Sequence, residues 1–281
     1  MCDSKADGGK RCPDKKAYMA MPLSRIIPDG EELAWVAELK KNRGEDFFSG
    51  AKGKDLNLWG MGYDCEACFV LERLKKAKTE ESEATPVLLE VADELGGKCE
   101  SLDCRIKSPD SMFDKVTKKY VAGAPYRHEH SSSEFEENTK DVIRYTISFT
   151  SHKNLFNSLS SSIDSFKKRG WSIEKINDGY MEGATYKGLH VIVRSKQGTL
   201  IEVQIHSEHS LGIKNSTHDA YDVARNPSKP YPDREEAKKF CVEKYSSIPT
   251  PVGLNEIYPN GGVNKESVLF KGVKIVKKYY R

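Results

Sequence analysis

The strongest constraint on the fold is a change in the hydrophobic period of the sequence near residue 141. Before this point apolar residues recur at helical spacing, whereas residues 142–149 and 189–205 have the pattern of β-strands. Within the second segment, four residues at 195–198 form a turn that predicts a β-hairpin. We therefore expect an α+β fold, in which a mixed β-sheet is flanked by helices.

The second strand of this hairpin has two different faces. Its residues alternate between apolar and polar, as Ile201, Val203 and Ile205 against Glu202, Gln204 and His206. Because successive side chains of a strand point to opposite faces of the sheet, the three polar side chains are expected together on one face. The apolar face is then expected in the core.

The remaining elements follow from periodicity and capping signals. Thr85 is a good N-cap with Pro86 behind it, so a separate helix is expected to begin there. Helices are expected at residues 31–41, 67–78, 85–95, 109–121, 155–166, 216–224 and 234–245, strands at 171–176 and 268–280, and a polar loop at 128–140.

The composition is typical of a soluble globular protein of 281 residues, with a formal net charge of +3. No apolar run is long enough to span a bilayer, and the N-terminus lacks the apolar core of a signal peptide. We expect a cytoplasmic protein, or one delivered into a target-cell cytoplasm without a classical signal.

Cysteines 65, 68, 99 and 104 have a spacing compatible with zinc, but buried thiols are the favoured interpretation.

A basic run precedes the strand region. Ser108 and Pro109 explain why a helix begins here, because they suit the N-cap and the first helical position. They do not explain the four polar residues that converge on the start of this helix, which are Arg105, Lys107, Ser111 and Lys115. Phosphates bind at such helix starts through free N–H groups and cations, so these four residues are predicted to hold a triphosphate.

Two separated carboxylates accompany the basic run. Asp141 opens the first strand, and Glu202 lies within the hairpin. Carboxylate oxygens are hard ligands that suit Mg²⁺, and cations with Mg²⁺ are what phosphoryl-type transfer requires. Asp141 and Glu202 are therefore the predicted metal ligands and catalytic residues.

In this order the motifs resemble those of RelA/SpoT-type (p)ppGpp synthetase domains, in their small alarmone synthetase or toxic form. The resemblance covers about residues 85–225 and consists of Arg105-x-Lys107-x3-Ser111-x3-Lys115, Asp141, Thr185-Tyr186-Lys187-Gly188-Leu189-His190, Glu202-Val203-Gln204-Ile205-His206-Ser207, and His218 with Tyr221. It implies a nucleotidyltransferase-like synthetase fold in residues 61–250. Residues 1–60 would then be an N-terminal arm with a short helix, and residues 251–281 a basic strand or tail.

The resemblance also implies roles for individual residues. Tyr186 would stack on the acceptor base in an open cleft. The other residues that it places on substrate are Arg144, Lys187, His190, Gln204, His206 and His218. Thr146 stands where the family has an arginine, and Arg144 lies two residues earlier. Lys187, Gly188 and His206 replace the family's Arg, Ser and Arg, so the departures gather on the acceptor side.

The expected function is an Mg²⁺-dependent transfer of pyrophosphate from ATP to the 3′-hydroxyl of a purine nucleotide. One alternative is a toxin that modifies the 3′ end of tRNA, for which Lys187, Lys214 and the C-terminal tail would supply cations. Another alternative is a catalytically silent nucleotide- or RNA-binding module. A toxin would have an antitoxin or immunity protein as its partner.

Overall fold

The computed structural model describes residues 27, 30–43, 66–120, 139–226, 229–258 and 267–280. Its α-helices are α2 (Glu32–Arg43), α4 (Glu66–Glu94), α5 (Pro109–Tyr120), α7 (Leu155–Lys168), α8 (Glu208–Arg225) and α9 (Tyr231–Ser246). Its strands are β1 (Lys98–Glu100), β2 (Arg144–Phe149), β3 (Ser172–Asp178), β4 (Leu189–Arg194), β5 (Leu200–Ser207), β6 (Ser267–Phe270) and β7 (Val273–Lys277). Short 3₁₀ turns occupy Leu102–Cys104 and Asn255–Ile257.

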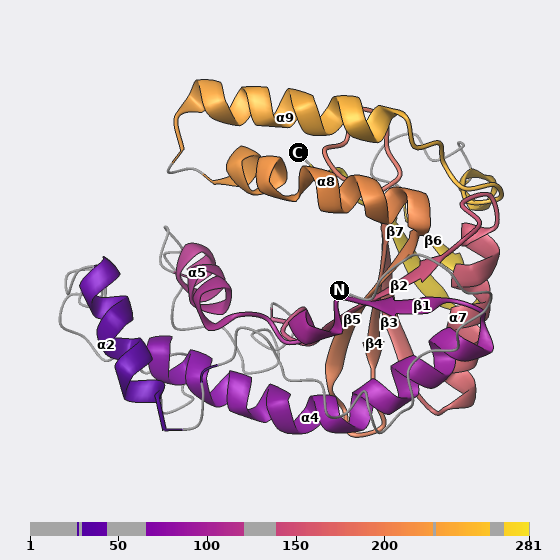
Figure 1. The fold of residues 1–281 in the computed structure, drawn as a ribbon. Coiled ribbons are helices and arrows are strands. Elements are labelled where there is room, and N and C mark those ends of the chain that lie inside the picture. The colour runs from indigo at the N-terminus through magenta and orange to yellow at the C-terminus, as the bar shows by residue number, and fades with distance from the viewer. Residues whose placement is uncertain are drawn as a thin grey trace, which may run out of the picture.

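The described strands form one mixed sheet in the order β1-β2-β5-β4-β3-β7-β6 (Figure 1). The pairs β2–β5 and β3–β7 are parallel, and the other neighbours are antiparallel. This arrangement confirms the expected α+β class and the hairpin of β4 and β5. Parallel pairing of β2 with β5 also brings the starts of these two strands together, and these starts carry the predicted carboxylates.

Helices cover both faces of the sheet (Figure 1). The α4 helix lies on the face that carries Tyr145, whose hydroxyl is 2.8 Å from Thr85 Oγ1. The α8 helix lies on the opposite face, where Lys214 Nζ donates to Gln204 Oε1 at 2.8 Å. The polar face of β5 is therefore covered as well, and His206 is fully buried.

The α4 helix corrects the expectation of two helices separated at Thr85. The helix runs unbroken from 66 to 94 with Pro86 inside it. Thr85 is no N-cap, because its hydroxyl donates to the Glu81 carbonyl at 2.9 Å and is fully buried. Buried residues on both sides of Pro86, among them Ala77 and Leu88, hold the helix together although proline removes one hydrogen bond.

The end of the chain is also different from the single strand expected at 268–280. Lys271 and Gly272 adopt positive φ angles of 51° and 73°, and the turn that they form folds the segment into a hairpin of β6 and β7. β7 then pairs in parallel with β3, with Ile275 beside Ile176. Residues 267–277 therefore belong to the same sheet as the predicted site.

Other boundaries differ by smaller amounts. α8 begins eight residues before the expected 216, because Ser207 caps it and accepts a hydrogen bond from Ser210 N at 3.1 Å. α9 similarly begins at Tyr231, ahead of the expected 234. Within the described residues, no helix has the length and apolar character needed to cross a membrane. Residues 128–138 of the expected polar loop lie outside the described residues.

Candidate active site

Three charged residues of the predicted phosphate and metal sites meet at the start of β2. Lys107 Nζ lies 3.3 Å from Asp141 Oδ2, and Lys115 Nζ contacts Asp141 Oδ1. The backbone explains this proximity, because Lys107 N donates to Val142 O at 2.9 Å and so attaches the basic run to the first residues of the strand. We call Lys107, Lys115 and Asp141 the donor cluster.

The donor cluster has an excess of positive charge. Burial raises the pKa of Asp141, but the charges of Lys107 and Lys115 outweigh it, so the pKa lies below the usual range. Asp141 is therefore a carboxylate at neutral pH and accompanies two cations. Ser111 lies nearby on the first turn of α5, where its N–H donates to the capping Ser108 Oγ at 3.3 Å.

Glu202 lies on β5 directly beside Arg144 of β2. Its carboxylate accepts from Gln204 Nε2 at 2.8 Å and lies 3.5 Å from His190 Nδ1. Burial raises the pKa of Glu202, but the charge and hydrogen bond of His190 and the charge of Arg144 outweigh it and lower the pKa. The charge of Glu202 also acts on Asp141, so the two carboxylates form one electrostatic site.

The structure accounts for Arg105 in a different way from the sequence. Its side chain is only 3% exposed, and Nε and Nη2 donate to the two carboxylate oxygens of Glu81 at 2.6 and 3.0 Å. Nη1 donates to Leu102 O at 2.8 Å. The guanidinium thus joins α4 to the 102–105 turn, a structural role that the sequence did not predict, and the phosphate contact expected of Arg105 stays a prediction.

On the acceptor side, Tyr186 is buried and its hydroxyl is shared between two histidines. The oxygen lies 2.8 Å from His190 Nε2 and 2.7 Å from His206 Nε2. Burial raises the pKa of Tyr186 well above its usual range and lowers that of His206 well below its own, so both stay neutral. We call Glu202, His190, Tyr186 and His206 the buried polar chain.

The burial of Tyr186 corrects the expectation that it stacks on a base in an open cleft. The side chain is 6% exposed, and aromatic or imidazole rings pack around it with centroids at 5.1–6.1 Å. These rings belong to His190, His206, Tyr221, Tyr245 and Tyr280. Tyr186 is therefore enclosed by other rings, and the partly exposed rings in this group are Tyr221 and Tyr280.

Gly188 and His206, two positions at which the sequence differs from the RelA/SpoT-type motifs, both contact Tyr186. A Cβ atom on Gly188 would lie 2.9 Å from Tyr186 Cζ and 2.8 Å from His206 Cε1. Any other residue at 188 would push these buried rings apart. Glycine at 188 and histidine at 206 together allow Tyr186 to fold inward, which local sequence reasoning could not show.

The third departure, Lys187, also points away from the site. Lys187 Nζ donates to Ile248 O at 2.7 Å, and this bond ties the loop to the segment after α9.

The exposed His218 lies on α8 between Lys214 and Tyr221, and the spacing of the three residues places them on one face of the helix. Arg225 continues this face one turn later, with Cζ 5.0 Å from the centre of the Tyr221 ring. The sequence did not single out Arg225.

The protein supplies few groups that could hold a metal. Among the described residues there is no group of three or more His, Cys, Asp and Glu side chains suited to a metal. Mg²⁺ in phosphate-transfer sites typically takes one or two carboxylates and completes its shell with water and substrate phosphates. Asp141 and Glu202 fit that requirement. Zinc binding by the four cysteines stays an untested alternative, because Cys65 and the side chain of Cys68 lie outside the described residues, and Cys99 and Cys104 are only partly buried, not fully as expected.

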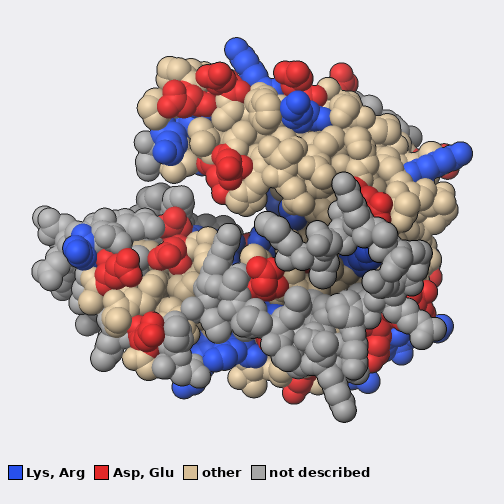
Figure 2. Space-filling model, viewed as in Figure 1, with Lys and Arg blue, Asp and Glu red and all other residues tan. Residues whose placement is uncertain are grey.

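Figure 2 shows a hollow between the part of the molecule formed by α8 and α9 and the part formed by α2 and α5, with Lys and Arg atoms in its depth.

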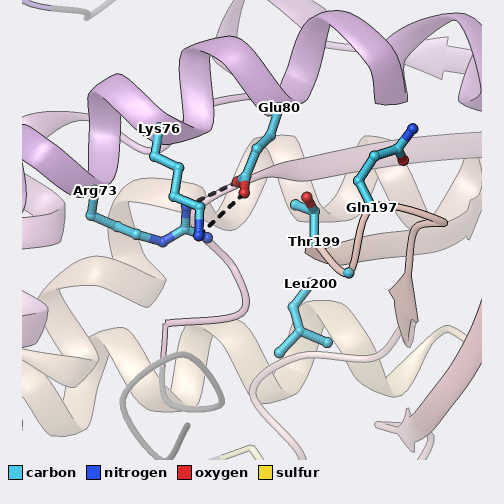
Figure 3. Close-up of a pocket in the computed structure, with 7 residues that line it drawn as sticks. Arg73, Lys76, Glu80, Gln197, Thr199 and Leu200 are labelled. Carbon is cyan, nitrogen blue, oxygen red and sulfur yellow. Dashed lines mark hydrogen bonds and ion pairs between the residues drawn. The ribbon is translucent and has the colours of Figure 1, made fainter. Parts of the chain in front are cut away.

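A separate cavity of about 210 Å³ lies between α4 and the β4–β5 turn (Figure 3). Arg73 and Glu80 line its α4 side and pair with each other, with Nη1 3.0 Å from Oε2, and Gln197, Thr199 and Leu200 lie on the other side. Its described lining includes no residue of the donor cluster or of the buried polar chain.

The fold and the site thus define an α+β protein with two carboxylates and several cations at the starts of adjacent parallel strands. No protein-family model and no curated protein sequence matches the chain. Solved structures do match it. The Type VI effector Tas1, solved in complex with its immunity protein, is 17% identical with a TM-score of 0.41, and the match covers 64% of this chain and 95% of that chain.

Two further structures come from the same class of protein that the motifs resemble. Small alarmone synthetase 1 from Bacillus subtilis is 16% identical with a TM-score of 0.43, over 63% of this chain and 89% of that chain. A GTP pyrophosphokinase family protein from Streptococcus pneumoniae is 12% identical with a TM-score of 0.38, over 63% and 84%. At these values the similarity assigns no substrate, and the function must be argued from the residues of the site.

Proposed function

We propose that this protein transfers pyrophosphate from ATP to the 3′-hydroxyl of a purine nucleotide and releases AMP. The observation that carries the proposal is the placement of Asp141 and Glu202 at the starts of β2 and β5, each held ionised among cations. Phosphoryl-type transfer needs positioning and charge neutralisation more than a covalent nucleophile, and this arrangement supplies both.

In the proposed reaction the 3′-oxygen of the acceptor bonds to the β-phosphorus of ATP, and the bond from that phosphorus to the oxygen on the α-phosphate breaks. Lys107 and Lys115 bind the ATP phosphates, because each ammonium has three N–H donors and Asp141 uses only part of them. Asp141 and Glu202 hold Mg²⁺, which neutralises the charge of the phosphates when it is bound. Glu202 accepts the proton of the attacking hydroxyl.

The acceptor side provides a different set of groups. Lys214, His218 and Arg225 lie along one face of α8. The spacing of Tyr221 places it on the same face. Burial lowers the pKa of Lys214 to about 8, which the charge of Arg144 also favours. This face offers cations for acceptor phosphates and an aromatic ring for its base.

A tRNA acceptor is the second candidate, and the contacts of the tail count against it. Lys271 pairs with Asp164, and Lys277 is fully buried against Asp178. Lys277 is therefore not offered to an RNA backbone and Lys271 already has an acidic partner, whereas Lys274 and Lys278 of the basic tail are exposed. Toxicity, delivery into a target cell and an antitoxin or immunity partner stay predictions.

The test is incubation of the purified protein with Mg²⁺, γ-labelled ATP and one acceptor at a time, chosen from GDP, GTP, ADP, ATP and deacylated tRNA. We expect label on a purine nucleotide, and none with an Asp141→Asn variant. Label on tRNA alone would establish the second candidate. Nucleotide binding without any transfer would identify a catalytically silent module, a reading that the two ionised carboxylates already disfavour.

A further inference from the structure

The C-terminal segment, residues 278–280, lies against the loop 179–188 that carries Tyr186. Lys278 N donates to Asp178 O at 2.8 Å, immediately before this loop. At the other end, Thr185 N and Oγ1 both donate to Tyr280 O, at 2.9 and 3.0 Å. Backbone hydrogen bonds thus fix the course of the segment on both sides of Tyr279.

A buried ion pair anchors the start of the segment. Lys277 Nζ lies 2.8 Å from Asp178 Oδ2, with side-chain exposures of 1% and 0%. The same carboxylate accepts from Tyr258 Oη at 3.0 Å and from Tyr180 N at 2.8 Å. An ion pair with this many additional hydrogen bonds holds its geometry closely, so residue 278 has little freedom to move away.

Glycines in the loop make room for the two tyrosines that follow. A Cβ atom on Gly179 would lie 2.9 Å from Tyr280 Cε2, which is closer than real Cβ contacts. Tyr279 Oη donates to Gly183 O at 2.8 Å. The loop therefore fits the C-terminal segment closely.

Tyr280 joins the segment to the buried polar chain. Its ring packs edge-on against Tyr186 at 5.1 Å between centroids, and its hydroxyl lies 3.3 Å from His190 Nδ1. The same nitrogen lies 3.5 Å from Glu202 Oε2. Tyr280 thus contacts the imidazole that orients the second carboxylate.

Lys278 brings a further cation to the site. Its side chain is exposed, and Nζ lies 4.7 Å from the centre of the Tyr280 ring. Burial lowers its pKa, and the charges that act on it are those of Glu202, Lys140, Arg225 and Lys115 of the donor cluster. Among the described residues no ion pair engages Lys278, in contrast to Lys277.

We infer that the C-terminal segment forms one wall of the acceptor subsite, in which Lys278 binds a phosphate of the acceptor nucleotide and Tyr280 positions His190 beside Glu202. Lys107 and Lys115 are engaged at Asp141 on the donor side. Lys278 lies over the ring of Tyr280, whose hydroxyl contacts the imidazole of His190 beside Glu202, so its exposed ammonium is suited to the acceptor phosphates. The inference rests on the proposed pyrophosphate transfer and names residues for its acceptor.

The first experiment measures the equilibrium affinity of the full-length protein for GDP and ADP by calorimetry. Lys278→Ala should weaken diphosphate binding by about 10- to 100-fold, the range for one charge-assisted contact, and Lys278→Arg should restore most of it. Lys274→Ala is the matched control, because Lys274 is exposed on β7 and should have no effect. An unchanged affinity of the Lys278→Ala protein for both diphosphates would overturn the assignment.

The second experiment uses steady-state transfer with the same variants. Lys278→Ala should raise the KM of the acceptor and leave that of ATP unchanged. Tyr280→Phe should lower kcat about 3- to 10-fold with little change in KM, as expected for one lost hydrogen bond that orients His190. Gly179→Ala, which displaces the Tyr280 ring, should lower kcat in the same way.

Two results would contradict the inference. A higher ATP KM in Lys278→Ala would place the lysine on the donor side, and faster transfer after truncation at Lys277 would mean that the segment blocks the subsite. If the wild-type protein transfers no pyrophosphate to any acceptor, the proposed function fails. The diphosphate affinities then still decide whether Lys278 binds a nucleotide phosphate.

Discussion

Arg105 and Glu81 form a buried ion pair with two hydrogen bonds, of 2.6 Å from Nε and 3.0 Å from Nη2. The Glu81 carboxylate also accepts from Thr85 Oγ1, which contacts Tyr145 of the sheet. This pair therefore connects α4, the basic run and β2. The basic run is joined in turn to the start of β2, where Lys107 N donates to Val142 O and Arg144 N donates to Arg105 O.

Arg105→Ala should destabilise the fold. Removal of one partner leaves the buried Glu81 carboxylate uncompensated, which costs about 3–5 kcal/mol of the free energy of unfolding. Urea unfolding measures this loss. As a control, the double change Arg105→Met with Glu81→Leu should recover much of it, because both charges are then removed. A stable Arg105→Ala protein with a raised KM for ATP would instead support the phosphate-binding role that the sequence predicts for Arg105.

Lys107→Ala, in contrast to Arg105→Ala, should weaken the use of ATP and leave the stability of the fold almost unchanged. The ammonium and Asp141 are partly buried, but Lys115 still pairs with Asp141 after the substitution, so the free energy of unfolding should change little, whereas the KM for ATP should rise about 10- to 100-fold. Steady-state transfer and thermal unfolding, measured on the same preparation, separate the two effects. Lys98→Ala, an exposed lysine on β1, serves as the comparison. Unaltered ATP kinetics would mean that Lys107 only neutralises Asp141.

Asp141→Asn and Glu202→Gln should each reduce transfer by at least about a hundredfold while the fold survives. Each substitution keeps the side-chain volume but removes a charged oxygen ligand for Mg²⁺. Circular dichroism should match the wild type, and a thermal melt should still show one cooperative transition. If either variant retained activity within about tenfold of wild type, Mg²⁺ could not depend on this pair.

Gly188→Ala should disturb the buried polar chain. The added Cβ would approach His206 Cε1 to 2.8 Å, so the rings must shift, at a cost of about 1–3 kcal/mol. The loss of transfer should accompany this destabilisation. Gly212→Ala is a matched control inside α8, where nothing lies within 4 Å of the added Cβ, and it should stabilise the protein by up to about 1 kcal/mol. Equal stability of the two variants would refute the packing argument.

Lys214→Met should stabilise the free protein at pH 7 by on the order of 1–3 kcal/mol and weaken the use of the acceptor. Burial lowers the pKa of Lys214 from 10.5 to about 8, so the unfolded chain binds more protons between these two values. The penalty is therefore fully present below pH 8 and disappears as the pH rises toward 10.5.

Urea unfolding of both proteins from pH 7 to 10, without nucleotide or Mg²⁺, tests this sign. The stability difference between variant and wild type should shrink as the pH rises. A difference that is constant with pH would mean that packing of the methionine, and not the charge of Lys214, is responsible.

Two features of the candidate site were predictable because their signals are local. The Ser108 cap and Pro109 predict where α5 begins, and the structure places that start as expected. The alternation in β5 predicts that Glu202, Gln204 and His206 share a face, and the hydrogen bond from Gln204 Nε2 to Glu202 Oε1 agrees with it. Capping and side-chain alternation depend on residues within a few positions, so one sequence contains them.

The tertiary structure alone decided the rest, because it depends on contacts between residues far apart in the chain. Arg105 was identifiable as a cation, but only the position of Glu81 on α4 determines that it is buried. Tyr186 could be recognised by its motif. Its burial, however, depends on Gly188, on His206 and on packing against Tyr280 of the C-terminal segment. Parallel pairing of β7 with β3 brings that terminus to the site, and no local pattern contains this pairing.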